Sequence, residues 1–178
     1  MNNIPHYVFV VDDECRLSRP ANEGDAGYDV IAVSEPEIVG VQYEGYNLYE
    51  RVDYIEYDLG VKIDGFQPIS SPHPDIFTLV FPRSSISKQN LVLANSVGVI
   101  DSGFRATLKA RFKYIFQPQD LVLMDGKVRG LVNLDKIYHK GDKVCQLLFK
   151  EHLHPTIEFV SKLDDSERNE GGFGSTGL

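Results

Sequence analysis

The sequence has little cysteine and no long apolar run, and each shortage excludes a class of protein. Only two cysteines, Cys15 and Cys145, occur in 178 residues, and they lie far apart. We therefore expect free thiols in a reducing, intracellular compartment rather than a disulfide framework. No apolar run approaches the length of a membrane span, and residues 1–6 lack the basic and apolar regions of a signal peptide. These shortages predict a cytoplasmic protein with no membrane partner.

Positive charge is also in short supply. Lys and Arg together number 18 against 26 Asp and Glu, which gives a formal net charge of −8. Non-specific nucleic-acid binding needs a basic surface, so we expect no nucleic-acid partner. An anionic small ligand is not excluded, because a local cluster of Arg side chains, backbone N–H groups and a metal ion would suffice to bind it.

Helical periodicity and internal repeats are missing as well. No segment of a dozen residues sustains the apolar period of a helix. The only helical turn that we expect lies at residues 86–90, with Ser84 or Ser85 as its cap. Short β-branched and aromatic runs, separated by Gly, Pro, Asn or Asp, instead predict strands. These runs are residues 6–11, 28–33, 76–81, 107–116, 143–149 and 156–160. Many short strands in a chain of this length predict one all-β barrel or sandwich.

The most informative stretch is residues 92–112, in which two apolar runs flank the turn residues Asp101, Ser102 and Gly103. A β-hairpin folded at this turn would place Asn95 opposite Lys109. The hairpin would enclose a slot walled by backbone amides, with a carboxylate at its tip. Asp-Ser-Gly is also a common surface turn, so this stretch alone leaves both interpretations open.

Two stretches look like insertions into the predicted β-barrel or sandwich. Residues 40–58 hold five of the nine tyrosines among acidic neighbours, which favours either a contact surface or a Tyr-edged surface strand or loop. Residues 117–140 contain Asp125-Gly126 between apolar runs, which predicts an extra hairpin with a type I′ turn. From Ser161 the chain becomes polar and then glycine-rich. We expect a barrel domain over residues 1–160 with these two inserts, followed by a flexible arm over residues 161–178.

Five segments, taken in order, resemble the signature motifs of the trimeric dUTPase family. They are residues 24–29, 82–85, 95–104, 141–146 and 168–177. The resemblance spans nearly the whole chain, and its most specific parts are the tail (Arg168 with Gly-Gly-Phe-Gly-Ser-Thr-Gly) and the Gly-Val-Ile-Asp core that ends at Asp101. It implies a homotrimer of distorted jelly-roll β-barrels, with three active sites at the subunit interfaces.

The same resemblance implies an activity. The family hydrolyses dUTP between its α and β phosphates to give dUMP and pyrophosphate, which limits uracil in DNA and supplies dUMP for dTMP synthesis. Asp101 matches the family's catalytic Asp, which holds and deprotonates the attacking water and also binds the 3′-hydroxyl. An aspartate side chain is ionised at neutral pH and can accept that proton.

The nucleoside would lie against the central hairpin. The residues implied in binding uracil and deoxyribose are Asn95, Gly98, Val99, Ile100, Phe104, Lys109 and Phe173. Backbone donors and acceptors fixed by a hairpin can distinguish uracil from cytosine. Phe104 stands where the family usually has Tyr, so its ring would still pack under the deoxyribose, and Phe173 would stack over the base.

The triphosphate needs donors and countercharge. The residues implied are Arg83, Ser84, Ser85, Gln146, Arg168, Gly174, Ser175 and Thr176. The glycine-rich tail would act as a lid that closes over the substrate. A Mg²⁺ ion is implied, held mainly by phosphate oxygens and water, with Asp29 supporting its waters.

The match to the family is imperfect at three positions. Gly103 stands where the family often has an acidic residue, and Ala106 and Asn169 stand where it usually has Gly. The turn is also similar to that of dCTP deaminases, but those enzymes carry a catalytic Glu ten residues after the Asp, and Arg111 stands there in this chain. Some phage members of the family carry insertions and bind regulatory proteins. The alternatives are therefore a dCTP deaminase-related enzyme or a dUTPase-fold module that binds a regulatory protein through its inserts.

Overall fold

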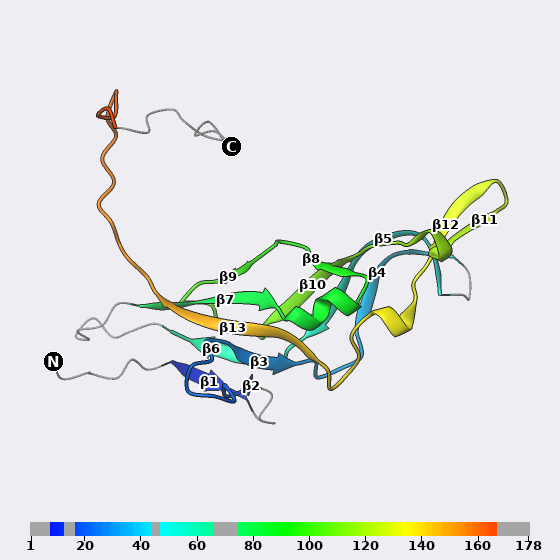
Figure 1. Cartoon of the computed structure of the whole chain (residues 1–178), viewed down its shortest axis with the longest axis horizontal. Coiled ribbons are helices and arrows are strands. Elements are labelled where there is room, and N and C mark those ends of the chain that lie inside the picture. Colours follow the sequence, from blue (N-terminus) through cyan, green and yellow to red (C-terminus); the bar gives the residue numbers. More distant parts are fainter. Residues whose placement is uncertain (1–7, 13–16, 44–46, 66–74, 167–178) are drawn as a thin grey trace.

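The computed structural model describes residues 8–12, 17–43, 47–65 and 75–166 (Figure 1). These residues form two antiparallel sheets and a two-stranded ribbon, joined by three short 3₁₀ turns. The chain is an all-β, distorted jelly-roll barrel, as the strand pattern and the resemblance predict. No helix in the described ranges is long and apolar enough to cross a membrane.

The six-stranded sheet has the order β11-β12-β5-β10-β8, with β4 also paired to β5. Its strands are β4 (Glu37–Gln42), β5 (Leu48–Asp58), β8 (Leu91–Leu93), β10 (Lys109–Tyr114), β11 (Leu121–Met124) and β12 (Lys127–Leu131). The strand β5 is the longest and pairs with β4, β10 and β12. The hairpin β11–β12 projects at the end of the molecule far from the C-terminal segment (Figure 1).

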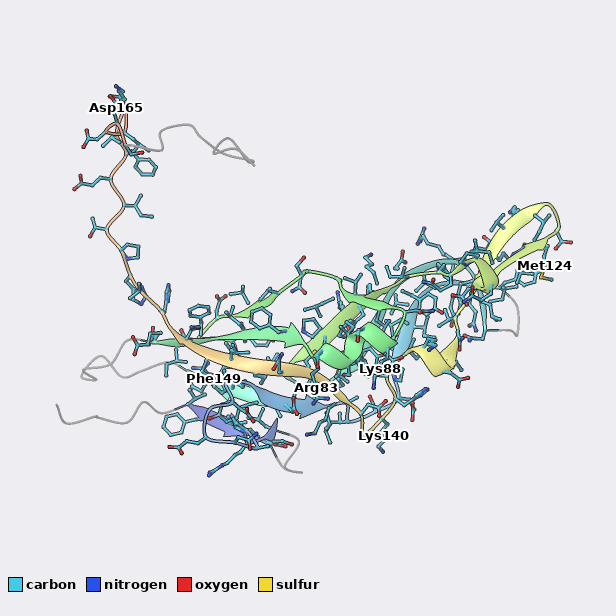
Figure 2. The ribbon with its side chains drawn as sticks, viewed as in Figure 1. Arg83, Lys88, Met124, Lys140, Phe149 and Asp165 are labelled. Carbon is cyan, nitrogen blue, oxygen red and sulfur yellow. The ribbon has the colours of Figure 1, made fainter. Side chains whose placement is uncertain are left out.

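The five-stranded sheet has the order β2-β3-β13-β7-β9. Its strands are β2 (Leu17–Ser18), β3 (Tyr28–Ile31), β7 (Ile76–Pro82), β9 (Gly98–Ile100) and β13 (Lys143–Glu151). Beside it, β1 (Phe9–Val11) pairs with β6 (Lys62–Asp64). The 3₁₀ turns are η1 (Ser84–Lys88), η2 (Pro118–Asp120) and η3 (Leu134–Lys136). Figure 2 shows the side chains on this ribbon, with Arg83 beside η1 and Phe149 on β13.

One hydrophobic core lies between the sheets. Along β10 exposed and buried residues alternate, so Ala110, Phe112 and Tyr114 point into the core. The rings of Tyr57 and Phe112 meet edge to face with centroids 5.5 Å apart. The largest fully buried side chains are Tyr57, Phe112, Ile55, Leu59, Leu108, Ile137, Leu147, Val30, Val61, Val132, Val144 and Thr78.

The prediction of a Tyr-edged surface strand or loop over residues 40–58 is wrong for two of its tyrosines. Tyr49 and Tyr57 are buried in the core, because β5 runs through the middle of the larger sheet. The type I′ hairpin is confirmed: Asp125 and Gly126 have φ of 51° and 74°, and Met124 pairs with Lys127. The hairpin does not stand alone, since Gly130 of β12 pairs with Tyr49.

Two smaller predictions are also wrong. Residues 156–160 form no strand; the chain beyond Glu151 has no partner strand in the described part, and Phe159 is 98% exposed. The helical turn begins at Ser84 rather than Ile86, and Arg83 precedes it without a side-chain cap. Ser84 and Ser85 therefore lie inside the turn, so neither is its cap.

Candidate functional site

The predicted hairpin over residues 92–112 is only partly formed. Leu93 pairs with Phe112, and Ala94 N–H donates to the Arg111 carbonyl at 2.9 Å. This register is one residue away from the predicted pairing of Asn95 with Lys109. Beyond Ala94 the arms separate, because Ser96 adopts a left-handed φ of 60° and sends the chain across to the other sheet.

The strand β9 consequently pairs with β7 and not with β10. Its register places Gly98 opposite Val80 and Ile100 opposite Thr78. A Cβ atom at Gly98 would lie 3.0 Å from Val80 Cβ, so a larger residue here would have to push Val80 aside. The prediction of one closed two-stranded hairpin is therefore wrong, and the space between the separated arms is larger than a hairpin would leave.

This space is a cavity of about 560 Å³, which we call the hairpin cavity. Its lining includes six of the residues predicted to bind uracil and deoxyribose: Asn95, Gly98, Val99, Ile100, Phe104 and Lys109. Val99 and Phe104 are 62% and 41% exposed, so this cavity offers apolar surface to a ligand. The structure brings these six residues together; Phe173 lies outside the described residues.

Asp101 lies between the cavity-lining residues Ile100 and Phe104, on a turn closed by a hydrogen bond from Phe104 N–H to the Asp101 carbonyl at 3.0 Å. Asp101 is exposed and is not among the residues that line the cavity. The neighbouring Arg105 fixes the turn, because its Nη1 donates to the Ser102 carbonyl at 2.8 Å and its Nη2 to Asp64 Oδ1 at 2.8 Å. The turn is thereby tied to β6.

A second cavity, of about 650 Å³, contains the polar residues of three other motifs; we call it the cation cavity. Asp29 on β3, Arg83 after β7 and Gln146 on β13 all line it. Asp29 Oδ1 accepts a hydrogen bond from Arg83 Nε at 2.7 Å, and Oδ2 accepts one from Lys143 Nζ at 3.0 Å. The Asp29 side chain is 22% exposed and that of Arg83 is 31% exposed, so water screens this pair only in part.

The remaining predicted phosphate ligands are distributed differently. Gln146 packs over Gly27, where a Cβ atom would collide with its amide oxygen. Ser85 Oγ is 3.2 Å from Tyr138 OH, and Ser84 is exposed; neither lines the cation cavity. Arg168, Gly174, Ser175 and Thr176 lie outside the described residues.

The two cavities lie at different places on the five-stranded sheet and share no lining residue. Phe81, Gln146 and Asp29 face one another across β7, β13 and β3, and all three line the cation cavity. Val80, one residue before Phe81, lines the hairpin cavity instead. The two sets of residues therefore form separate sites within one copy of the chain.

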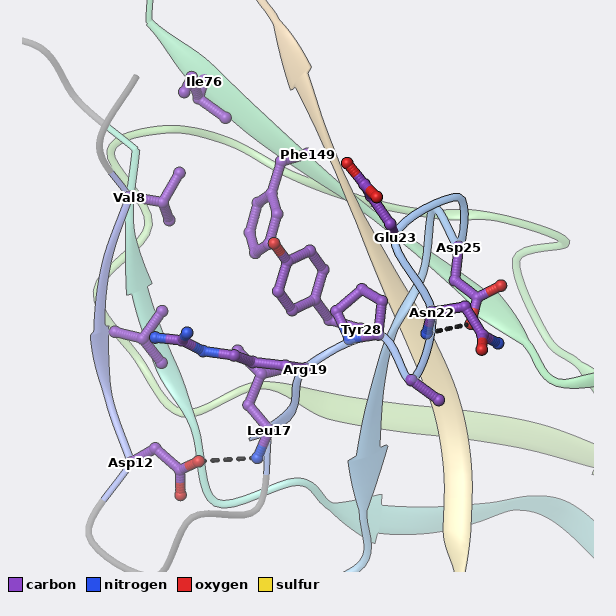
Figure 3. Close-up of a pocket in the computed structure, with 13 residues that line it drawn as sticks. Val8, Asp12, Leu17, Arg19, Asn22, Glu23, Asp25, Tyr28, Ile76 and Phe149 are labelled. Atoms are coloured by element: carbon purple, nitrogen blue, oxygen red, sulfur yellow. Dashed lines mark hydrogen bonds between the residues drawn. The ribbon is translucent and has the colours of Figure 1, made fainter. Parts of the chain in front are cut away.

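Figure 3 shows a third cavity, of about 900 Å³, which borders the cation cavity and shares Arg19, Pro20, Ala21 and Asp25 with it. The rings of Tyr28 and Phe149 meet edge to face here at 5.2 Å. Asn22 N–H donates to Asp25 Oδ2 at 3.0 Å and holds the intervening loop. None of the residues predicted to bind substrate lines this third cavity.

Sequence reasoning missed several residues around the cavities. Lys143 was inside a recognised motif but was not predicted to bind anything, although it pairs with Asp29. Arg19 lies just before the first motif and lines the cation cavity. The sequence signal that could have indicated Lys143 and Arg19 was a basic residue in or close to one of the five motifs. The pairing of Arg105 with Asp64 joins residues 41 positions apart and had no local signal.

No group of three or more His, Cys, Asp or Glu in the described part of the chain could hold a metal ion alone. The Asp29 carboxylate at the cation cavity could support the water ligands of a hard cation that takes most of its ligands from phosphate and water. Cys145 is fully buried, and this burial raises the pKa of its thiol to about 12, so it is unsuited to nucleophilic chemistry.

The chain is similar in sequence to known dUTPases. The dUTPase family model matches residues 123–177. The deoxyuridine 5′-triphosphate nucleotidohydrolase of Clostridium acetobutylicum is 30% identical over 169 residues, covering 94% of this chain and 93% of that protein. That of Desulfitobacterium hafniense is 30% identical over 181 residues, covering 100% and 99%. That of Escherichia phage T5 is 35% identical over 102 residues, which span 57% of this chain and 58% of the phage protein.

Solved structures share the fold. The dUTPase of Staphylococcus bacteriophage 80alpha, solved with dUPNHPP, superposes with a TM-score of 0.66 and 21% identity over 98% of this chain and 100% of that one. A variant of the dUTPase of phage phi11 of S. aureus, whose structure describes the coordination of a structural Mg(II) ion, gives a TM-score of 0.56 and 20% identity over 88% and 97%.

Proposed function

This chain belongs to the dUTPase family and is a hydrolase of dUTP, and we propose that its active site is assembled from two or more copies of the chain. One copy binds the nucleoside in its hairpin cavity, and a neighbouring copy binds the triphosphate in its cation cavity. The products are dUMP and pyrophosphate. In a cell this reaction limits uracil in DNA and supplies dUMP for dTMP synthesis.

The observation that carries the proposal is the separation of the predicted site residues into two cavities that share no lining residue. A substrate with a base at one end and phosphates at the other needs both sets of residues within its own length. Two copies related by rotation can place the hairpin cavity of one against the cation cavity of the next. A closed ring of three such copies is the homotrimer that the sequence resemblance implies.

In the hairpin cavity the base forms hydrogen bonds with main-chain groups and with Asn95. The ring of Phe104 packs against the deoxyribose and leaves no room for a 2′-hydroxyl. A base whose hydrogen-bonding pattern is reversed leaves buried groups unpaired, and such a mismatch discriminates by roughly 10⁴.

Beside this cavity, Asp101 holds the attacking water and accepts its proton as the water oxygen bonds to the α-phosphorus. The bond from the α-phosphorus to the bridging oxygen then breaks, and pyrophosphate leaves. The contacts of Arg105 with the turn keep the carboxylate at the edge of the base site. Holding the water and the phosphorus at a fixed separation lowers the entropic part of the barrier.

In the cation cavity Arg83 and Gln146 donate to the phosphates, and Lys143 adds a second positive charge. Ser84 and Ser85, which follow Arg83 in η1 but lie outside the lining of this cavity, would add backbone N–H donors to the phosphates. A Mg²⁺ ion, held by phosphate oxygens and water with support from Asp29, would offset the charge of the triphosphate. Arg168 and residues 173–176 complete the site as a lid from the C-terminal arm, with Phe173 over the uracil.

Pyrophosphate release from dUTP, dCTP, dTTP and UTP in the presence of Mg²⁺ tests this function. We expect a clear preference for dUTP, and equal rates on the four substrates would contradict it. Release of ammonia from dCTP would support the deaminase-related alternative instead. That alternative lacks a carboxylate at Arg111, ten residues after Asp101.

A second function, binding of a regulatory protein, is favoured by the β11–β12 hairpin. Leu121, Leu123 and Val128 lie on one face of it and are 50%, 72% and 64% exposed. We propose that this face contacts the partner. A pull-down comparing wild type with Leu123→Asp and Val128→Asp would test it, and identical bound proteins for both would count against it.

A further inference from the structure

We propose that Glu56, which belongs to none of the five motifs, is a positioning residue that fixes the β10 wall of the base site and so determines the affinity for the base. The proposal rests on the proposed function of the hairpin cavity. Glu56 itself lies on β5, on the side of β10 away from that cavity, and does not touch it.

The Glu56 carboxylate is buried and uses both of its oxygens. Its side chain is 8% exposed, and Oε1 is 2.5 Å from Lys109 Nζ while Oε2 is 2.7 Å from Arg111 Nε. Lys109 and Arg111 both line the hairpin cavity and stand two residues apart on β10, hence on the same face of the sheet. One carboxylate therefore binds the side chains at two successive positions of the cavity wall.

The main chain of Lys109 faces the base. The Arg111 carbonyl accepts from Ala94 N–H on the β8 side, whereas the Leu108 carbonyl accepts from Leu59 N–H on the β5 side. Backbone groups alternate in direction along a strand, so those of Lys109 point to the same side as those of Arg111. Since β9 has left that side to pair with β7, the Lys109 N–H and C=O face the hairpin cavity.

The Arg111 side chain is held from two directions. Its guanidinium lies over the Tyr54 ring, 4.3 Å from the centroid, and its Nε donates to Glu56. Hydrogen bonds from Lys109, and then from Arg111, lower the pKa of the Glu56 carboxyl despite its burial, so it stays ionised at neutral pH. Glu56 thus holds two flexible cations toward β5 and stiffens the strand that presents the Lys109 main chain.

Replacement of Glu56 by Gln removes the charge and keeps the size. Lys109 and Arg111 use different oxygens of Glu56, and Gln replaces one of these by an NH₂ donor, so one cation loses its acceptor and is released beside the base site. We expect the KM for dUTP to rise by about tenfold and the preference for dUTP over dCTP to fall by a similar factor. The kcat at saturating dUTP should stay within about twofold of wild type, because Asp101 and the phosphate site are unchanged.

The matched control is Asp53→Asn. Asp53 lies on the same strand and forms a close pair with Arg51 at 2.7 Å, but neither residue lines the hairpin cavity. This variant should keep the wild-type KM and selectivity. If Glu56→Gln lowers the melting temperature, Lys109→Gln serves as the test variant instead. The Lys109 side chain is 49% exposed, so its replacement leaves the core intact. It should raise KM in the same direction by a smaller factor.

The outcomes separate this inference from the proposed function. If wild type does not prefer dUTP, the function itself fails. If wild type prefers dUTP while both the KM and the selectivity of folded Glu56→Gln stay within about twofold of wild type, the positioning role alone is overturned. A loss of kcat with unchanged KM would also overturn it.

Discussion

Asp29 Oδ1 lies 2.7 Å from Arg83 Nε, so a carboxylate on β3 orients the guanidinium that follows β7. The other oxygen binds Lys143, which places two cations from two strands around one anion. The arrangement fixes the cations before a triphosphate arrives, and such preorganisation reduces the entropy lost on binding.

We predict that Asp29→Asn raises the KM for dUTP by about tenfold, because Arg83 and Lys143 lose their common partner. The concentration of Mg²⁺ that gives half-maximal activity should also rise if the carboxylate supports the waters of the ion. Steady-state kinetics at several Mg²⁺ concentrations measure both effects. Asp25→Asn is the control, since Asp25 lines the same cavity but binds Asn22 in its own turn; an equal effect from both variants would contradict the account.

A methyl group at Gly27 should lower activity without unfolding the protein. The added Cβ would collide with the Gln146 amide, which is the far end of a flexible side chain and can swing away. We expect Gly27→Ala to reduce kcat/KM by about tenfold with little change in Tm. Gly24→Ala in the same loop has nothing within 4 Å of the new Cβ and should behave as wild type.

The Arg105–Asp64 pair should affect turnover more than binding. Asp64→Asn weakens the contact that ties the Asp101 turn to β6, so the catalytic carboxylate would sample more orientations. We expect kcat to fall by roughly tenfold and KM to stay within about twofold. Unchanged kcat in a folded Asp64→Asn protein would show that the turn needs no support from β6.

Cys145 should be inert in the folded protein. Burial raises the pKa of its thiol to about 12, so almost no thiolate is present at pH 8. In a Cys15→Ser background, a thiol reagent at pH 8 should label Cys145 only after denaturation. Rapid labelling of the native protein would mean that the core between β13 and its neighbours opens readily.

Much of the fold could be predicted because local patterns agree with the final pairing. The run at residues 76–81 became β7 (Ile76–Pro82), and that at 143–149 became β13 (Lys143–Glu151). Asp125-Gly126 adopted the positive φ values that its residue types favour. Residues 156–160 have the same composition as a strand but pair with no strand among the described residues, and composition alone cannot supply one.

The separation of β9 from β10 could not be predicted. It depends on a positive φ at Ser96, a residue type that rarely marks such a position, and on the contact of Gly98 with Val80 in the other sheet. The candidate site was more predictable than this path, since six predicted residues still line one cavity. Glu56 and Asp64, which pair with Lys109 and Arg105 near that cavity, come from distant strands and carry no local signal.

The central claim is that one active site draws on two copies of the chain, and complementation between two inactive variants tests it most directly. Asp101→Asn disables the site at the hairpin cavity, and Arg83→Ala disables the phosphate site in the cation cavity. Each variant alone should therefore be nearly inactive on dUTP. The two variants are co-expressed with different tags and purified as mixed oligomers. Some subunit interfaces then combine an intact hairpin site from one copy with an intact cation cavity from another. We predict about one quarter of wild-type pyrophosphate release from an equal mixture. Mixed oligomers no more active than the separate variants would contradict the claim.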